Sequence, residues 1–136
     1  MRLRVSQLVA VHPKKVFVLA GTNSLSFSKD DFEMEYKSLL DSIQESLPYV
    51  KVYILNIIPQ CDGTLGNSEC NHIIRERNEF IKEYAKSKKI CYIDLYSLYV
   101  DKNGDLNNKY TEDGVHILSE AYSLWADLIK SYVYME

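Results

Sequence analysis

Three short apolar runs, separated by longer segments of helical periodicity, constrain the fold of this chain more than any other feature. The runs lie at about residues 16–20, 50–58 and 90–95. The first is apolar on both faces, which is typical of a strand buried between two layers. Strands that alternate with long helices predict right-handed βαβ units. We therefore expect an α/β fold in which a parallel sheet lies between two layers of helices, a three-layer αβα arrangement.

The segments around these runs indicate where the helices begin and end. Apolar residues at helical spacing follow Ser28 and Asp30, either of which could cap a helix that ends at Pro48. Ser119 is placed to cap the last helix. Gly104 is the expected positive-φ position of a turn over residues 101–105. The predicted helices cover about residues 3–11, 28–47, 68–87 and 119–132.

Two polar motifs follow predicted strands, at the edge where parallel sheets bind their ligands. Gly21-Thr22-Asn23 closes the first strand, whereas Asp113 and His116 lie in a loop after the third. A histidine is a suitable general base, and a carboxylate on its other ring nitrogen fixes the tautomer. The Asn23 amide is a suitable oxyanion donor, and Gly21 permits a tight turn. Taken singly, each motif also fits an ordinary turn.

Together, the two motifs resemble conserved blocks of the SGNH/GDSL hydrolases, the family of GDSL-type esterases and lipases. Leu19-Ala-Gly-Thr-Asn23 looks like the third block, which carries the asparagine of the oxyanion hole. Tyr110-Thr-Glu-Asp-Gly-Val-His116 looks like the fifth block, which carries the catalytic aspartate and histidine. Between them, Arg77-Asn78 and Tyr92-Ile-Asp94-Leu95 are similar to the usual connecting pattern. The resemblance covers essentially the whole chain, in the family's order.

This resemblance implies a flavodoxin-like SGNH hydrolase fold and a serine esterase. His116 would be the general base, Asp113 its orienting acid and Asn23 an oxyanion donor, with Gly21 supporting the turn. The substrate would be a small ester, such as an acetylated sugar or a lipid. No metal or organic cofactor is implied.

The sequence departs from the family pattern at its nucleophile. Neither Gly-Asp-Ser nor a G-x-S-x-G elbow occurs among the 136 residues. We therefore expect residues 1–136 to form a single SGNH domain that lacks its N-terminal strands, and to be nearly inactive alone. Ser24 stands where the family usually has an aspartate, and neither Ser24 nor Ser26 lies on the strand that carries the family's nucleophile. The missing strands would leave strand 16–20 with an open edge that favours homodimerisation.

Composition narrows the class of protein further. The net charge is −3 without a basic stripe, which argues against nucleic-acid binding, and no apolar run has the length of a membrane span. The count of three cysteines is odd; Cys91 is expected to be buried, and a disulfide between Cys61 and Cys70 stays open. Localisation is undetermined: cytoplasmic, or exported if a signal peptide was lost with the N-terminus.

Two other functions fit an α/β domain of this kind. One is a non-catalytic module that keeps the SGNH fold and binds a carbohydrate or a protein, although the presence of both Asp113 and His116 argues against it. The other is a flavodoxin-like nucleotide binder. The chain has neither G-x-G-x-x-G after a strand nor a phosphate loop with lysine, which disfavours nucleotide binding.

Overall fold

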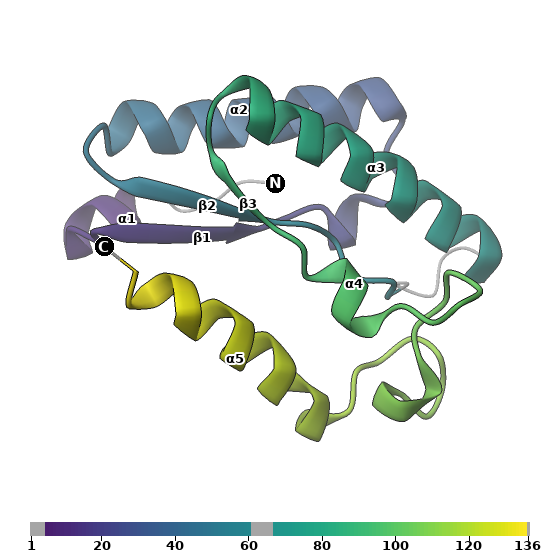
Figure 1. Ribbon diagram of the computed structural model, residues 1–136. Coiled ribbons are helices and arrows are strands. Elements are labelled where there is room, and N and C mark those ends of the chain that lie inside the picture. Colours follow the sequence, from purple (N-terminus) through teal and green to yellow (C-terminus); the bar gives the residue numbers. More distant parts are fainter. Residues whose placement is uncertain (1–4, 61–66, 136) are drawn as a thin grey trace.

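A computed structural model describes residues 5–60 and 67–135 of the chain (Figure 1). Helices and strands alternate along these residues, as the apolar runs predict. The helices are α1 (Val5–Val11), α2 (Lys29–Ser46), α3 (Asn67–Ser87), α4 (Tyr96–Tyr99) and α5 (Tyr122–Val133). The strands are β1 (Lys15–Leu19), β2 (Lys51–Leu55) and β3 (Cys91–Ile93). Three short 3₁₀ turns complete the path: η1 (Thr22–Ser24), η2 (Asn108–Tyr110) and η3 (Ser119–Ala121).

The three strands form one parallel sheet in the order β1-β2-β3, with Val18 opposite Ile54 and Ile54 opposite Tyr92. Helices α2 and α3 cover one face and α5 covers the other (Figure 1). This arrangement confirms the predicted α/β class and the αβα layering. Because all strands run in the same direction, the loops that follow them meet at one edge.

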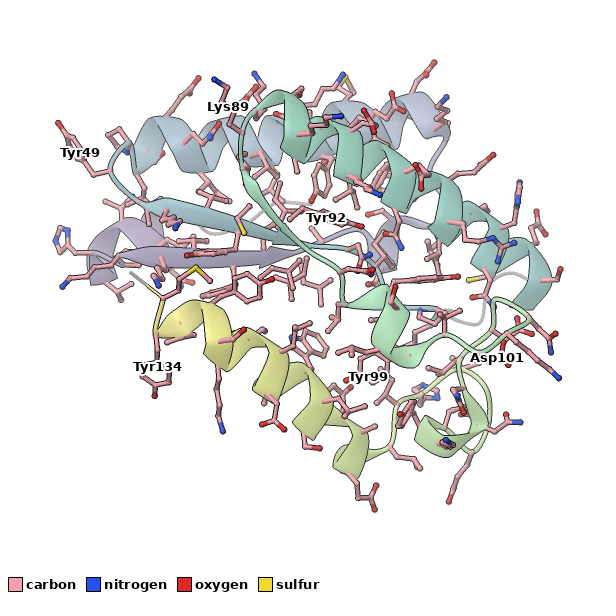
Figure 2. All side chains as sticks on the ribbon, in the orientation of Figure 1. Tyr49, Lys89, Tyr92, Tyr99, Asp101 and Tyr134 are labelled. Atoms are coloured by element: carbon pink, nitrogen blue, oxygen red, sulfur yellow. The ribbon has the colours of Figure 1, made fainter. Side chains whose placement is uncertain are left out.

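Alternating side chains of the strands build two cores, one on each face of the sheet. Val16, Val18, Val52 and Ile54 pack against α2 and α3, where Tyr36, Leu40, Ile43, Ile74 and Ile81 are fully buried. The other core contains Tyr53, Leu55, Ile93, Tyr99 and Ala121 and is closed by α5. Tyr99 of α4 lies beside α5 (Figure 2), and its hydroxyl donates a hydrogen bond to the Ala121 carbonyl (2.8 Å).

The prediction that strand 16–20 is buried on both faces is right for only one face. Val16 and Val18 are buried, but Phe17 and Leu19, which point to the α5 side, are only half-buried. Helix α5 itself has no fully buried residue. A single helix on this face explains the difference, since two helices cover the opposite face.

The second and third strands end earlier than their apolar runs, at the point where the Asn56 side chain binds the segment that follows β3. Its Oδ1 accepts from the backbone amides of Leu95 and Tyr96, both at 2.7 Å. Its Nδ2 donates to the Tyr92 hydroxyl (2.7 Å) and to the Asp94 carboxylate (2.8 Å). The chain therefore leaves the sheet after Ile93 and forms α4, which the sequence did not predict.

Of the predicted helix caps, the one at α2 is confirmed and the one at the last helix is wrong. Ser28 caps α2, because its hydroxyl accepts from the Asp31 amide at 3.1 Å. Ser119 does not cap the last helix: it lies within η3, and α5 begins only at Tyr122. Gly104 has the expected positive φ, at 86°.

Two of the three cysteines, Cys91 and Cys70, lie within the described residues. Cys91 is a free thiol but is half-buried rather than buried, because it lies on the outer strand β3. Cys70 is buried in α3 and disulfide-bonded, whereas Cys61 lies outside the described residues. None of the described helices is long and apolar enough to cross a bilayer.

Candidate active site

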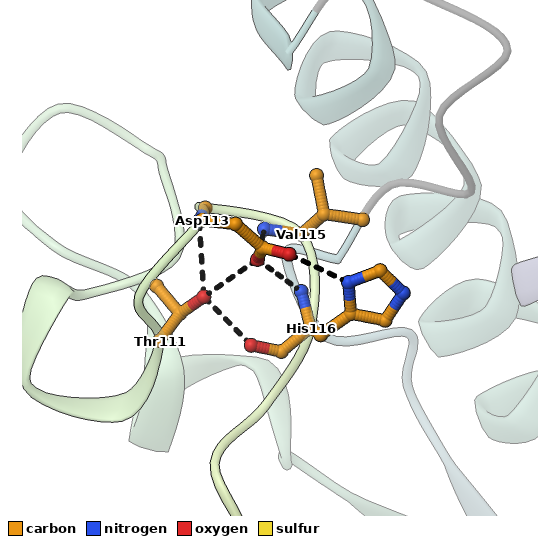
Figure 3. Close-up of polar contacts among 5 residues, drawn as sticks. Thr111, Asp113, Val115 and His116 are labelled. Carbon is orange, nitrogen blue, oxygen red and sulfur yellow. Dashed lines mark hydrogen bonds and ion pairs between the residues drawn. The ribbon is translucent and has the colours of Figure 1, made fainter.

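The loop that contains Asp113 and His116 is folded by the Asp113 carboxylate itself (Figure 3). Its Oδ1 accepts from the backbone amides of Val115 (2.9 Å) and His116 (2.8 Å). Gly114, between Asp113 and Val115, has φ 80°, a left-handed conformation that favours glycine. The Asp-Gly-Val-His spacing therefore turns the backbone back on itself, so that the two functional side chains meet.

The other carboxylate oxygen of Asp113 lies 2.7 Å from Nδ1 of His116. An ionised carboxylate only accepts hydrogen bonds, so this contact places a proton on Nδ1, and in the neutral imidazole the lone pair is then on Nε2. The imidazole is 80% exposed, and among the described residues no hydrogen bond occupies Nε2. The structure thus forms the predicted pair, with the basic nitrogen of His116 open to solvent.

Thr111 stabilises this loop through hydrogen bonds, and the sequence alone did not indicate this role. It is buried, and its hydroxyl donates to the His116 carbonyl (2.6 Å) while accepting from the Gly114 amide (3.0 Å). The hydroxyl also lies 3.2 Å from Oδ1 of Asp113. One buried side chain therefore joins both ends of the turn, and the signal in the sequence was only a threonine two residues before the aspartate.

The hydrogen bonds to Asp113 favour its charged form. The backbone amide of His116, the His116 side chain and the Val115 amide together hold the pKa of this carboxyl well below its usual range. The folded state thus binds the proton less readily than the unfolded chain. The contribution of Asp113 to stability is therefore present above the ordinary aspartate pKa and is lost as the pH falls towards the depressed folded value.

We expect a carbon-13 NMR titration of the Asp113 carboxyl to show no midpoint near the ordinary value of about 3.9. The carboxyl should stay ionised at that pH, because protonation breaks the bonds from Val115 and His116. In Thr111→Ser the hydroxyl is kept, so the titration should not change. A midpoint at or above the ordinary value would contradict the geometry of this loop.

The second motif lies at the carboxyl end of β1, as predicted. Gly21 has φ 110° and begins η1, whose Ser24 amide donates to the Gly21 carbonyl (3.1 Å). Asn23 is the middle residue of η1, but its side chain lies outside the described part of the chain. Ser24 is buried and Ser26 is exposed. The turn therefore places Asn23 directly beyond the sheet.

Both motifs lie on the side of the molecule to which the strands point (Figure 1). No hydrogen bond among the described residues joins η1 to the loop of Asp113 and His116. Two further residues from α3, Arg77 and Asn78, hold the segments around η1. The other two histidines lie on the surface: His12 is exposed, and Nε2 of His72 lies 3.4 Å from the Glu76 carboxylate. No cluster that could hold a metal ion occurs among residues 5–60 and 67–135.

Comparison with known proteins places this arrangement in a family. The sequence pattern of the GDSL-like lipase/acylhydrolase family matches residues 1–124. The chain belongs to this family. The match spans both motifs of the candidate site, from Gly21 to His116.

A solved structure agrees with the fold of this GDSL-like chain, and two curated proteins are similar to it in sequence. A GDSL-like lipase from Bacteroides thetaiotaomicron VPI-5482 superposes with a TM-score of 0.76 at 25% identity, covering 95% of this chain and 70% of that one. The platelet-activating factor acetylhydrolase IB subunit alpha1 of Pongo abelii is 22% identical over 127 residues, covering 90% of this chain and 52% of that protein. The N-acylneuraminate cytidylyltransferase of Escherichia coli O18:K1:H7 (strain RS218 / NMEC) is 28% identical over 130 residues, covering 93% of this chain and 30% of that protein.

The GDSL-like chain thus spans about a third and about half of the two curated relatives. The similarity supports the fold and the family. The activities in the names of those longer proteins stay with those proteins.

Proposed function

We propose that this GDSL-like chain carries the base, the orienting acid and one oxyanion donor of a serine ester hydrolase. The observation that carries the proposal is the 2.7 Å contact between Asp113 and His116, with Nε2 of the exposed ring open to accept a proton. In this role His116 takes the proton of a serine hydroxyl as the serine attacks an ester carbonyl. Asp113 stabilises the imidazolium that forms, and Asn23 donates to the oxyanion.

We propose that the serine of this reaction comes from polypeptide outside these 136 residues. No Gly-Asp-Ser occurs in the chain, Ser24 is buried, and Ser26 follows η1 rather than the strand that carries the family's nucleophile. The substrate we propose is a small ester, an acetylated sugar or a lipid, because the family consists of lipases and acylhydrolases.

The proposal is tested by supplying the serine. We would join this chain to a segment that contains Gly-Asp-Ser, the nucleophile motif of the GDSL pattern, and assay p-nitrophenyl acetate hydrolysis. The chimera is expected to turn over, and His116→Gln should lower its kcat by about 10³-fold or more, because the general base is lost. His72→Gln, on the exposed face of α3, is the matched control and should leave kcat unchanged. Turnover that does not depend on His116 would overturn the assignment.

We further propose that the chain forms a homodimer through the open edge of β1, the strand that was predicted at residues 16–20. This strand is at one side of the sheet, and its half-buried Phe17 and Leu19 lie beside a helix that buries none of its residues completely. Unpaired apolar edges recruit other strands.

Sedimentation velocity over a range of concentrations is therefore expected to show a monomer–dimer equilibrium. Leu19→Lys should shift it to monomer, because a charged side chain on an edge strand opposes pairing. Met34→Lys, an equivalent change at an exposed position on α2, should not. A monomer at every concentration would rule out the dimer.

A further inference from the structure

Arg77 of α3 is buried directly beneath the segment that follows Asn23. Only 6% of the residue is exposed. Its guanidinium donates to three backbone carbonyls: those of Ser24, of Leu25 (3.4 Å) and of Phe27 (2.7 Å). All three oxygens belong to the stretch where η1 ends, so one side chain holds the loop from η1 to the start of α2.

The partners of this guanidinium are unusual for a buried cation. Among the described residues no carboxylate forms an ion pair with Arg77. Its flat face instead lies over the Phe32 ring, 4.3 Å from the centroid. A buried charge is costly unless it is paired or fully hydrogen-bonded. The carbonyl oxygens of the loop are therefore the hydrogen-bond partners of Arg77, and the Ser24 carbonyl also accepts from the Phe27 amide (3.1 Å).

The next residue along α3 fixes the other side of the turn. Asn78 bonds both backbone groups of Ile57: its Oδ1 accepts from the amide (2.8 Å), and its Nδ2 donates to the carbonyl (2.7 Å). Ile57 in turn lies against Gly21, where its Cδ1 would be only 2.8 Å from an added Cβ. The pair Arg77-Asn78 therefore holds both segments that flank η1.

We propose that Arg77 is a positioning residue that fixes the loop of residues 21–27 and thereby the backbone position of Asn23. The catalytic value of this positioning rests on the proposed function of Asn23. Arg77 does not touch the reacting atoms. It acts through the backbone, and the fork of the guanidinium is required because a lysine ammonium cannot reach three carbonyls with one planar group.

The experiment measures amide hydrogen exchange in this loop. The reporters are the amides of Ser24 and Phe27, which bond to carbonyls within the loop, and the reference is the Ile90 amide, which bonds to Ala85. In Arg77→Ala the two reporters are expected to exchange about ten-fold faster relative to the reference, because local opening becomes easier. Arg75→Ala, at an exposed position on the same helix, is the matched control and should change neither reporter.

Chemical rescue distinguishes loss of the guanidinium group from a general loss of stability in Arg77→Ala. Arg77 lines a cavity of about 520 Å³ together with Phe27, Phe32 and Ile73, so a small cation can reach the space that the shortened side chain leaves. Guanidinium at about 20 mM, far below denaturing concentrations, should restore protection of Ser24 and Phe27 in Arg77→Ala. Methylammonium at the same concentration should not, because it lacks the fork.

Arg77→Lys keeps the charge and serves as a second variant should Arg77→Ala fail to fold. It is expected to show the same faster exchange at Ser24 and Phe27. Protection that is unchanged in Arg77→Lys, or faster exchange in Arg77→Ala that guanidinium leaves as it is, would overturn the positioning role. The exchange measurement needs no esterase activity, so it is independent of the proposed function. If the Arg77 variants exchange faster but an Asn23→Ala chimera keeps full activity, the proposed function of Asn23 is rejected while the contact of Arg77 with the loop stands.

Discussion

Assayed alone, the 136-residue chain is expected to hydrolyse p-nitrophenyl acetate at less than about one percent of the rate of a GDSL-like lipase that carries its own serine. The proposed base and its proposed orienting carboxylate already lie in contact, since Asp113 is 2.7 Å from His116. On the proposed mechanism, however, His116 has no family serine to activate in the isolated chain. In a comparable triad enzyme, loss of the serine alone costs about 10⁶ in kcat.

A fluorophosphonate probe gives the second measurement for the isolated chain. The probe reacts with an activated serine, so this chain should stay unlabelled, including at Ser24 and Ser26. The serine-supplied chimera should be labelled, and His116→Gln should abolish that labelling. Stoichiometric labelling of the isolated chain would show that it contains a nucleophile that the family pattern does not predict.

Gly21→Ala is expected to lower the free energy of unfolding by about 2–4 kcal/mol. Two separate effects add at this position. The φ of 110° is one that residues with a side chain rarely adopt. An added Cβ would also lie 2.8 Å from Cδ1 of Ile57 and 2.9 Å from Cε2 of Phe32, both in well-packed surroundings. The resemblance implied that Gly21 supports the turn, and the structure adds a steric reason.

Gly104→Ala is the matched control for this destabilisation. Gly104 also has a positive φ, 86°, but the atom that an added Cβ would meet is Nη1 at the tip of the exposed Arg75 side chain. That tip can move, so only the backbone strain should remain, about 1 kcal/mol. Urea unfolding of the two variants checks the difference, and equal losses of stability would contradict the steric part of the argument.

The periodicity of the sequence was sufficient to predict the layers of the fold. The apolar runs became β1, β2 and β3, and the stripe that follows Ser28 became α2, because burial on two faces and on one face leaves different repeats. The ends of the strands were not predictable in this way. Asn56 ends β2 through contacts with Leu95 and Tyr96, and a residue about forty positions away leaves no local signal.

The candidate site likewise combines a local motif that the sequence predicted with long-range contacts that it did not. Asp113 and His116 form a local motif, so their meeting followed from the spacing around Gly114. Arg77 makes long-range hydrogen bonds to the loop after η1. In the sequence, Arg77-Asn78 only resembled a connecting pattern, which did not indicate what Arg77 binds. Thr111 was likewise hidden, because its role depends on backbone groups that only the folded turn brings together.

The proposed chemistry requires Asn23 and His116 to face one cleft at the carboxyl edge of the sheet. A donor about 3 Å from the oxyanion and a base about 3 Å from the attacking serine have to surround one tetrahedral carbon. A crystal structure of the chain should therefore place Nδ2 of Asn23 within about 8 Å of Nε2 of His116, with both atoms open to the same cleft. A separation beyond about 12 Å, or an amide that points into the α2–α3 core, would contradict the proposed chemistry.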